Sequence, residues 1–191
     1  MVKAKTNEGL VSREEIETAA KILKKGGVVI FPTDTVYGIG AKFDDKVAVG
    51  RIRKIKGTPK SQKMPVLIDE VSYLKKLECE VGKEAKKLIE KYWPGALTLV
   101  FNSEIGKVGL RIPNHPITLS LIDEAGFPII GTSANFHGEP VAKNFNQIDK
   151  KFLEKVDYVL KGECTIGAES TVVDVTGKTP KILREGAIRL S

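Results

Sequence analysis

Hydrophobic residues in this chain alternate, along its whole length, between helical spacing and the short continuous runs of buried strands. Residues 12–15 have the form of a capping box, and the apolar residues after it recur at helical spacing up to Leu23. The pair Gly26-Gly27 ends this predicted helix, and residues 28–31 then predict a buried strand. Such alternation is typical of an α/β protein, in which helices cover a sheet.

The same two signals recur further along the chain. Helices are predicted from Asp44-Asp45 to Gly57, around residues 85–92, from Pro116 onward and near residues 147–153. Strands are predicted at residues 66–68, 97–101, 108–112, 127–130, 158–160, 172–175, 182–183 and 188–190. We therefore expect one α/β domain over residues 1–191 with a mixed sheet. Helix-linked strands favour parallel pairs, and the strand-rich C-terminal third favours antiparallel pairs.

Composition and charge exclude several classes of protein. Hydrophobic residues make up 41% and charged residues 29% of 191, which is the balance of a globular domain rather than a disordered chain. The first ten residues are polar and no apolar run is long enough to span a bilayer, so we expect a cytoplasmic protein without a membrane segment. Cys79 and Cys164 are not in a CxxC pair and are expected to be reduced thiols. The net charge of +7 fits a polyanionic partner such as a nucleotide or RNA, or simply a lysine-rich surface, and charge alone favours the surface.

Common catalytic motifs are missing. There is no GxxxxGK[ST] phosphate loop, no GxGxxG after a strand, no HExxH and no GxSxG. The only two histidines are His115 and His137, which are too few for a histidine metal site, and His115 before Pro116 is expected at a helix start.

Six polar segments that follow or interrupt strands are the candidate binding elements. They are residues 31–38, 54–63, 108–113, 131–138, 167–174 and 182–186. Each has a functional and a structural interpretation. For example, Arg111 inside an apolar strand must either bind a carboxylate or phosphate with its fork or pair with an internal acid. The lysines at 54–63 either neutralise a triphosphate or form a solvated surface at a helix C-terminus.

Two further segments, both with hydroxyl groups, are equally open to a functional or a structural interpretation. Thr33 and Thr35 directly follow a strand, where α/β sheets bind ligands, but their side chains can also simply close a turn. Ser133 and Asn135 lie between glycines, which suits either close approach to a phosphate or a tight connection. None of the six segments contains an evident base or nucleophile, which indicates a site that orients reactants.

Seven stretches of the chain, in their order and spacing, resemble the YrdC/Sua5/YciO family. They are FPTDTVYGIGA, the basic stretch ending in Met64-Pro65-Val66, YWPGALTLV, GLRIPNHP, GTSAN with GEP, GAESTVVD, and ILREGAI. The match runs from about Gly26 to Ile188, within a motif-bearing part of about residues 12–190. There is no room for the extra C-terminal domain of the longer Sua5 members, so the chain resembles the single-domain form.

This resemblance implies a twisted mixed sheet flanked by helices, with a basic concave cavity. It also implies threonylcarbamoyl-AMP synthase activity, a nucleotidyl transfer in which L-threonine, bicarbonate and ATP give threonylcarbamoyl-adenylate and pyrophosphate. Mg²⁺ is expected to enter with ATP, with no metal held by protein side chains. A separate transferase complex is expected downstream, which modifies adenosine 37 of tRNAs reading codons that begin with A.

The resemblance also implies roles for individual residues. Those expected at L-threonine are Thr33, Thr35, Thr171 and Arg111, with Arg111 holding the carboxylate. Those expected at ATP are Lys56, Lys60, Ser133, Asn135 and Arg184, of which Lys56, Ser133 and Asn135 orient the phosphates.

One departure from the family pattern keeps other functions open. The family commonly has Lys-x-Arg at the basic segment, whereas this chain has Lys56-Gly57-Thr58. Threonine supplies no guanidinium, and Lys60, Lys63 or Arg53 could replace it geometrically. The alternatives are a YciO-like paralogue, a double-stranded-RNA-binding or ribosome-maturation module, and a carbamoyl-adenylate activity like that of hydrogenase-maturation proteins. The last of these carry additional domains.

Overall fold

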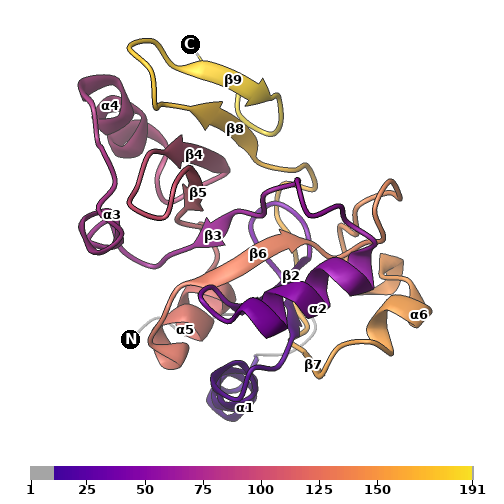
Figure 1. Cartoon of the computed structure of the whole chain (residues 1–191). Coiled ribbons are helices and arrows are strands. Elements are labelled where there is room, and N and C mark those ends of the chain that lie inside the picture. Colours follow the sequence, from indigo (N-terminus) through magenta and orange to yellow (C-terminus); the bar gives the residue numbers. More distant parts are fainter. Residues whose placement is uncertain (1–10, 191) are drawn as a thin grey trace.

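Nine strands of the described residues form one mixed sheet with the order β7-β1-β2-β6-β3-β5-β4-β8-β9 (Figure 1). The computed structural model describes residues 11–190. The strands are β1 (Val29–Phe31), β2 (Gly38–Lys42), β3 (Val66–Leu67), β4 (Leu97–Phe101), β5 (Val108–Arg111), β6 (Ile129–Ser133), β7 (Tyr158–Val159), β8 (Thr171–Asp174) and β9 (Lys181–Arg184). The helices are α1 (Arg13–Lys24), α2 (Lys46–Lys56), α3 (Tyr73–Lys76), α4 (Lys83–Tyr92), α5 (Pro116–Ala125) and α6 (Lys150–Leu153), with a 3₁₀ turn at Phe145–Gln147.

The sheet is mixed, as predicted, but the pairing differs in detail from the expectation. Strands β1 and β7, β3 and β5, and β4 and β8 pair in parallel, and the other neighbours are antiparallel. Strands β5 and β6 are linked by α5, yet β3 lies between them and β6 runs antiparallel to β3. In the C-terminal third, antiparallel pairs were expected, but β8 pairs in parallel with β4, a strand distant from it in the sequence. Only its pairing with β9 is antiparallel.

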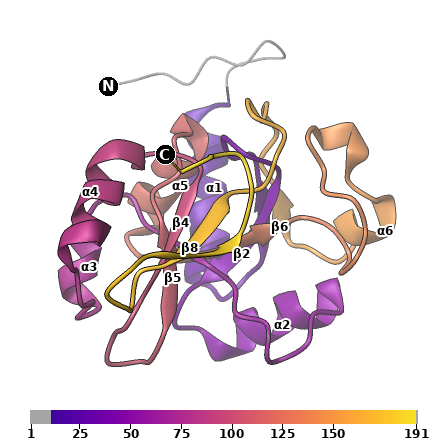
Figure 2. The same cartoon turned by 90° about the horizontal axis from the view of Figure 1, so that it is seen from above.

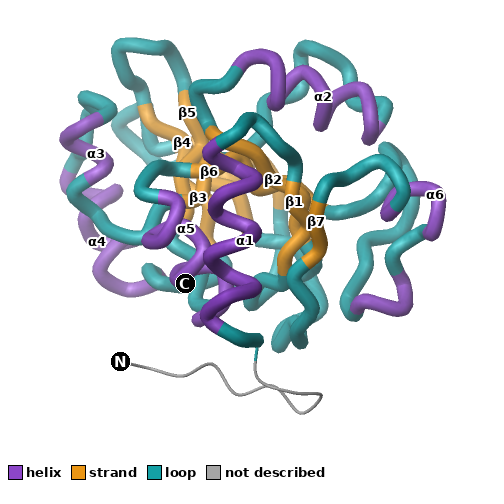
Figure 3. The backbone as a smooth tube through the Cα atoms, turned by 90° about the horizontal axis from the view of Figure 1, so that it is seen from below, coloured by secondary structure: helices purple, strands orange, loops and turns teal. Residues whose placement is uncertain are grey.

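Helices surround the sheet on one face and at both of its sides. Helices α1 and α5 lie side by side across one face (Figure 3), and they enclose one of two apolar clusters together with Val29, Phe31 and Ile129. Helices α3 and α4 lie at one side of the molecule and α2 and α6 at the other (Figure 2). Because side chains alternate along a strand, the neighbours of those three residues belong to the second cluster, on the opposite face.

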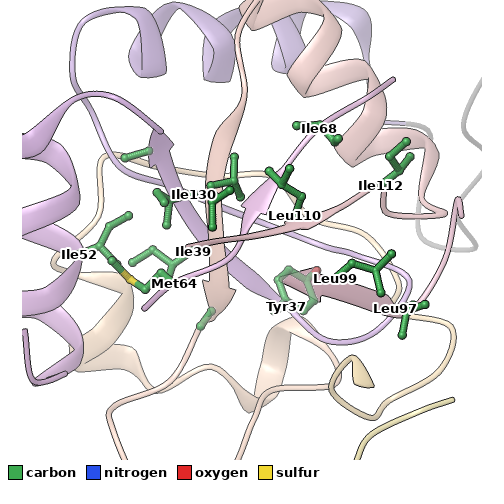
Figure 4. Packing of buried hydrophobic residues seen from close by; sticks show 14 of the residues in the cluster. Tyr37, Ile39, Ile52, Met64, Ile68, Leu97, Leu99, Leu110, Ile112 and Ile130 are labelled. Atoms are coloured by element: carbon green, nitrogen blue, oxygen red, sulfur yellow. The ribbon is translucent and has the colours of Figure 1, made fainter. Parts of the chain in front are cut away.

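The second cluster is the larger of the two and connects α2 to the centre of the sheet. Figure 4 shows Ile52 of α2 beside Met64 and Ile39, with Tyr37 and Leu99 further along. All five of these side chains are buried. This packing fixes the position of α2 relative to the central strands.

Helix ends agree with the sequence prediction because they depend on local chemistry. The Ser12 side chain accepts a hydrogen bond from the Glu15 amide, and the Ser12 amide donates one to the Glu15 carboxylate, which completes the predicted capping box. The Asp45 carboxylate caps α2, and Gly57 ends it with a φ of 70°, in the left-handed region. Pro116 begins α5.

Several other boundaries were predicted wrongly. Strand β2 was not predicted, because its sequence Gly-Ile-Gly-Ala-Lys lacks β-branched runs and is extended only by pairing with β1 and β6. Strand β6 was expected at 127–130 but continues to Ser133, because β2 pairs with it over that length. Helix α3 was also missed, residues 188–190 form no strand, and the helix expected near 147–153 is divided into a 3₁₀ turn and α6.

Two further expectations concern the chain as a whole. Among residues 11–190, no helix is both long enough and apolar enough to cross a bilayer. The predictions for the first ten residues, and the domain range of 1–191 in so far as it includes them and residue 191, lie outside the described residues.

Candidate functional site

A cavity of about 610 Å³ opens on the side of β4, β5 and β8 that faces away from the larger core. Alternate residues of the three strands line it, and they are Thr98 and Val100, Gly109 and Arg111, and Val172 and Asp174. Their neighbours Leu99, Leu110 and Val173 are buried in the core, as the two-residue period of a strand requires. This volume is within the range of small-molecule sites.

The turn between β1 and β2 contributes a network of hydroxyl groups to the cavity. The Thr33 Oγ1 donates to the Val36 carbonyl at 2.7 Å and lies 2.8 Å from the Thr35 Oγ1, and both threonines are buried. From the other side, the amides of Ile166 and Gly167 donate to the carbonyls of Asp34 and Thr35. The turn interpretation is therefore correct for these hydroxyls, and both threonines also line the cavity.

Arg111 reaches this turn from β5 and pairs with an internal acid, as the structural alternative predicted. Its Nη2 donates to the Asp34 carboxylate, its Nη1 to the Thr35 Oγ1 at 2.9 Å, and its Nε to the Gly95 carbonyl at 2.9 Å. Burial lowers the pKa of Arg111 from its ordinary value, and Asp34 opposes that effect. A guanidinium has five N–H donors. Within the described part of the chain three have acceptors, which leaves one on each terminal nitrogen at the cavity wall.

Lys56, the last residue of α2, brings the second and fourth candidate segments together. It is only 5% exposed, so the prediction of a solvated surface is wrong for this residue. Its Nζ donates to the carbonyls of Ser133 and Asn135, and to the Asn135 Oδ1 at 3.1 Å. Its own carbonyl accepts from the His137 amide at 2.7 Å. Burial lowers the pKa of Lys56 to about 8, with Glu169 acting in the opposite direction.

The remaining predicted residues are divided between the cavity and other places. Ser133, Asn135 and Arg184 line the cavity, whereas Lys60 is exposed and does not. The Arg184 guanidinium is itself held, with Nη1 2.9 Å from the Glu169 carboxylate and Nη2 2.8 Å from the Ser170 carbonyl.

Thr171, like Lys60, does not line the cavity, and its side chain points toward the core. Its position in β8 has the parity of the core-facing residues, and it is 1% exposed. Its Oγ1 donates to the Ile188 carbonyl at 2.6 Å and accepts from the amides of Gly186 and Ile188. Thr171 therefore fastens the last residues of the chain to β8, and its predicted place beside the amino acid is corrected.

The residues that could replace the missing guanidinium at position 58 also have distinct places. Arg53 donates through Nη1 to the carbonyls of Pro59 and Gln62, and it does not line the cavity. Lys63 does line it. The Thr58 hydroxyl is buried and has no hydrogen-bond partner among residues 11–190.

Sequence reasoning assigned no individual role to some residues of the cavity, although His137 and Asp174 lie within two of the six candidate segments. Lys107 and Asp174 form an ion pair of 2.9 Å at its wall, and His137 and Glu139 follow the Ser133–Asn135 turn. Strand alternation, applied to β8, would have found Asp174. His115 is correctly placed at the start of α5, with its Nε2 3.0 Å from the Glu163 carbonyl. Among the described residues, no group of three or more His, Cys, Asp or Glu side chains is arranged to hold a metal ion.

The chain matches a known protein family over most of its length. Residues 21–186 match the family model for Sua5, YciO and YrdC proteins, which is described as telomere recombination. The chain belongs to the Sua5/YciO/YrdC family. The resemblance inferred from the seven motifs is confirmed, and so is the mixed α/β fold that it implied.

Relatives within the Sua5/YciO/YrdC family differ in length. Threonylcarbamoyl-AMP synthase of Pyrococcus abyssi is 37% identical over 187 residues, which cover 92% of this chain and 55% of that protein. The crystal structure of P. abyssi Sua5 complexed with L-threonine aligns with a TM-score of 0.85 and 38% identity, over 90% of this chain and 54% of the other. The crystal structure of Escherichia coli YciO aligns with a TM-score of 0.83 and 28% identity, over 92% and 90%. This chain spans about half the length of the P. abyssi protein.

The buried pair between Asp34 and Arg111 gives a first testable prediction. The change Asp34→Asn leaves the guanidinium buried without its counter-charge, so we expect the free energy of unfolding to fall by about 3–5 kcal/mol. Urea denaturation measures this loss. The matched control is Glu84→Gln, in the exposed pair with Lys87, which should cost less than about 1 kcal/mol. Equal, small losses in both variants would contradict the structural importance of the buried pair.

A second prediction concerns the protonation of Lys56. Its pKa in the folded protein is about 8, below the ordinary 10.5, so the unfolded chain binds more protons between these two pH values. The contribution of Lys56 to stability therefore becomes more favourable as the pH rises through about 8. We expect the free energy of unfolding of the wild type, relative to Lys56→Met, to increase by about 1–3 kcal/mol from pH 7 to pH 10.

The control for this measurement is Lys54→Met, because Lys54 is an exposed lysine on the same helix. The difference in free energy of unfolding between the wild type and Lys54→Met should stay constant over the same pH range. A difference between wild type and Lys56→Met that shrinks at high pH would show that the carbonyl acceptors outweigh burial at this site.

Proposed function

We propose that this chain is a threonylcarbamoyl-AMP synthase, which converts L-threonine, bicarbonate and ATP into threonylcarbamoyl-adenylate and pyrophosphate. The observation that carries the proposal is one cavity with two chemically different walls. One wall presents Arg111 with the Thr33 and Thr35 hydroxyls, and another presents the Ser133–Asn135 turn and several cations. The relative from P. abyssi is named threonylcarbamoyl-AMP synthase, and P. abyssi Sua5 has been crystallised with L-threonine. Both similarities support the same assignment for this chain.

The Arg111 wall suits the amino acid. Two N–H donors, one on each terminal nitrogen, remain for the substrate carboxylate, and Asp34 and Gly95 hold the guanidinium in place. The Thr33 and Thr35 hydroxyls lie beside it in fixed orientations, because each is committed to neighbouring groups of the turn. Such fixed groups bind the substrate without a reorganisation cost.

The Ser133–Asn135 wall suits the nucleotide. The reaction joins two anions, because threonine nitrogen and bicarbonate first give a carbamate with loss of water, and a carbamate oxygen then attacks the α-phosphorus of ATP while pyrophosphate leaves. Cations and hydrogen-bond donors lower the barrier to such an encounter more than a protein nucleophile would. Five Lys or Arg residues line the cavity against three Asp or Glu residues. Mg²⁺ belongs to the ATP substrate and neutralises charge on the phosphate oxygens.

The product also defines the reaction that follows. A mixed anhydride of a carbamate and a phosphate is an activated acyl donor, so it must be consumed by transfer to a nucleophile. We propose that a separate cytoplasmic transferase complex performs that step on adenosine 37 of tRNAs reading codons that begin with A.

The direct test is to incubate the purified protein with ATP, Mg²⁺, bicarbonate and L-threonine, and to search for threonylcarbamoyl-AMP by chromatography and mass spectrometry. We expect product only when all four are present, and equal amounts with or without RNA. A folded protein that makes no product would contradict the proposal and favour a YciO-like or RNA-binding function. RNA binding through charge would be recognised by its steep loss with added salt.

A further inference from the structure

The cations that line the cavity differ in whether a carboxylate of the protein already neutralises their charge. Arg111 is paired with Asp34, Arg184 with Glu169, and Lys107 with Asp174. Lys56 has no carboxylate in hydrogen-bond contact, but its three N–H donors meet three oxygen acceptors in a buried position. To contact a ligand directly, Lys56 would have to give up bonds that its burial makes costly to lose.

Lys63 is the exception among these cations. Its Nζ donates to a neutral backbone acceptor, the Lys107 carbonyl at 2.5 Å, and it is paired with no carboxylate among the described residues. The side chain is exposed and lines the cavity. An ammonium group has three donors, so two of them remain available for a ligand.

The backbone beneath Lys63 is held on both sides. Before it, Arg53 Nη1 binds the carbonyls of Pro59 and Gln62, and the Gln62 amide donates to the Pro59 carbonyl. After it, Met64 is buried in the larger core. The backbone at Lys63 is therefore held in place, while its long side chain is exposed.

We propose that Lys63 is the cation that contacts the phosphate groups of the nucleotide directly, while Lys56 stays on its carbonyl acceptors. The inference rests on the proposed function for the identity of the ligand. Polyphosphate binding requires positive charge that is not already neutralised, and Lys63 is the lining residue that offers it. A compact ammonium on a four-carbon stem can also follow the phosphates as they rearrange.

The test is titration calorimetry with α,β-methylene-ATP and Mg²⁺, in the presence of L-threonine, with adenosine as the phosphate-free probe. We expect Lys63→Ala to weaken binding of the ATP analogue by about tenfold or more, as for loss of a charged hydrogen bond, and to change adenosine binding less than about twofold. Lys63→Arg should recover most of the loss. The matched control is Lys46→Ala, at an exposed lysine that begins α2 outside the cavity lining, which should bind like the wild type.

The outcomes separate this inference from the proposed function. If the wild type binds the analogue and Lys63→Ala binds it equally well, the inference is overturned and the synthase proposal stands. If Lys63→Ala weakens the binding of the ATP analogue and of adenosine equally, the lysine supports the fold of the site rather than contacting phosphate. That result also overturns the inference. A wild type that binds neither probe contradicts both proposals.

Discussion

The ion pair between Asp34 and Arg111 joins the turn after β1 to β5, which are not neighbours in the sheet formed by the described residues. Asp34 lies in the turn between β1 and β2, whereas Arg111 ends β5, and β6 and β3 lie between β2 and β5. Both side chains are almost fully buried, so the pair has lost the hydration of two charges. Hydrogen bonds from Arg111 to Thr35 and Gly95 offset part of that cost. The result is a turn and a guanidinium with one defined geometry at the cavity wall.

Lys56 has the same structural role at the wall formed by the Ser133–Asn135 turn. Its ammonium group binds the carbonyls of a turn that follows β6, and so connects the end of α2 to that turn. Burial of a charge without a carboxylate in contact costs stability, which the lowered pKa of Lys56 expresses. Both buried cations therefore hold the walls of the cavity in place at a cost in stability. Lys63 is more exposed, and in our proposal it is the cation that contacts the ligand.

Local chemistry explains how much of this could be predicted from the sequence. Caps such as Ser12, Asp45 and Gly57 determine helix ends by themselves, so the predicted helices largely agree with the structure. The family motifs indicated that Thr33, Arg111, Lys56 and the Ser133–Asn135 turn belong together, and the structure places all of them around one cavity. What failed depends on partners distant in the sequence. Strand β2 is extended by β6, and the direction of Thr171 is set by the register of β8 on β4.

In the proposed function, the Asp34–Arg111 pair holds the guanidinium ready for the carboxylate of the amino acid. A crystal structure of this chain soaked or grown with L-threonine would show whether it does. We expect the carboxylate oxygens within hydrogen-bond distance, about 2.7–3.2 Å, of both terminal nitrogens of Arg111, with the ion pair to Asp34 intact. Threonine bound elsewhere in the cavity, or an Arg111 side chain that leaves Asp34 to reach it, would show that the pair does not prepare the carboxylate site.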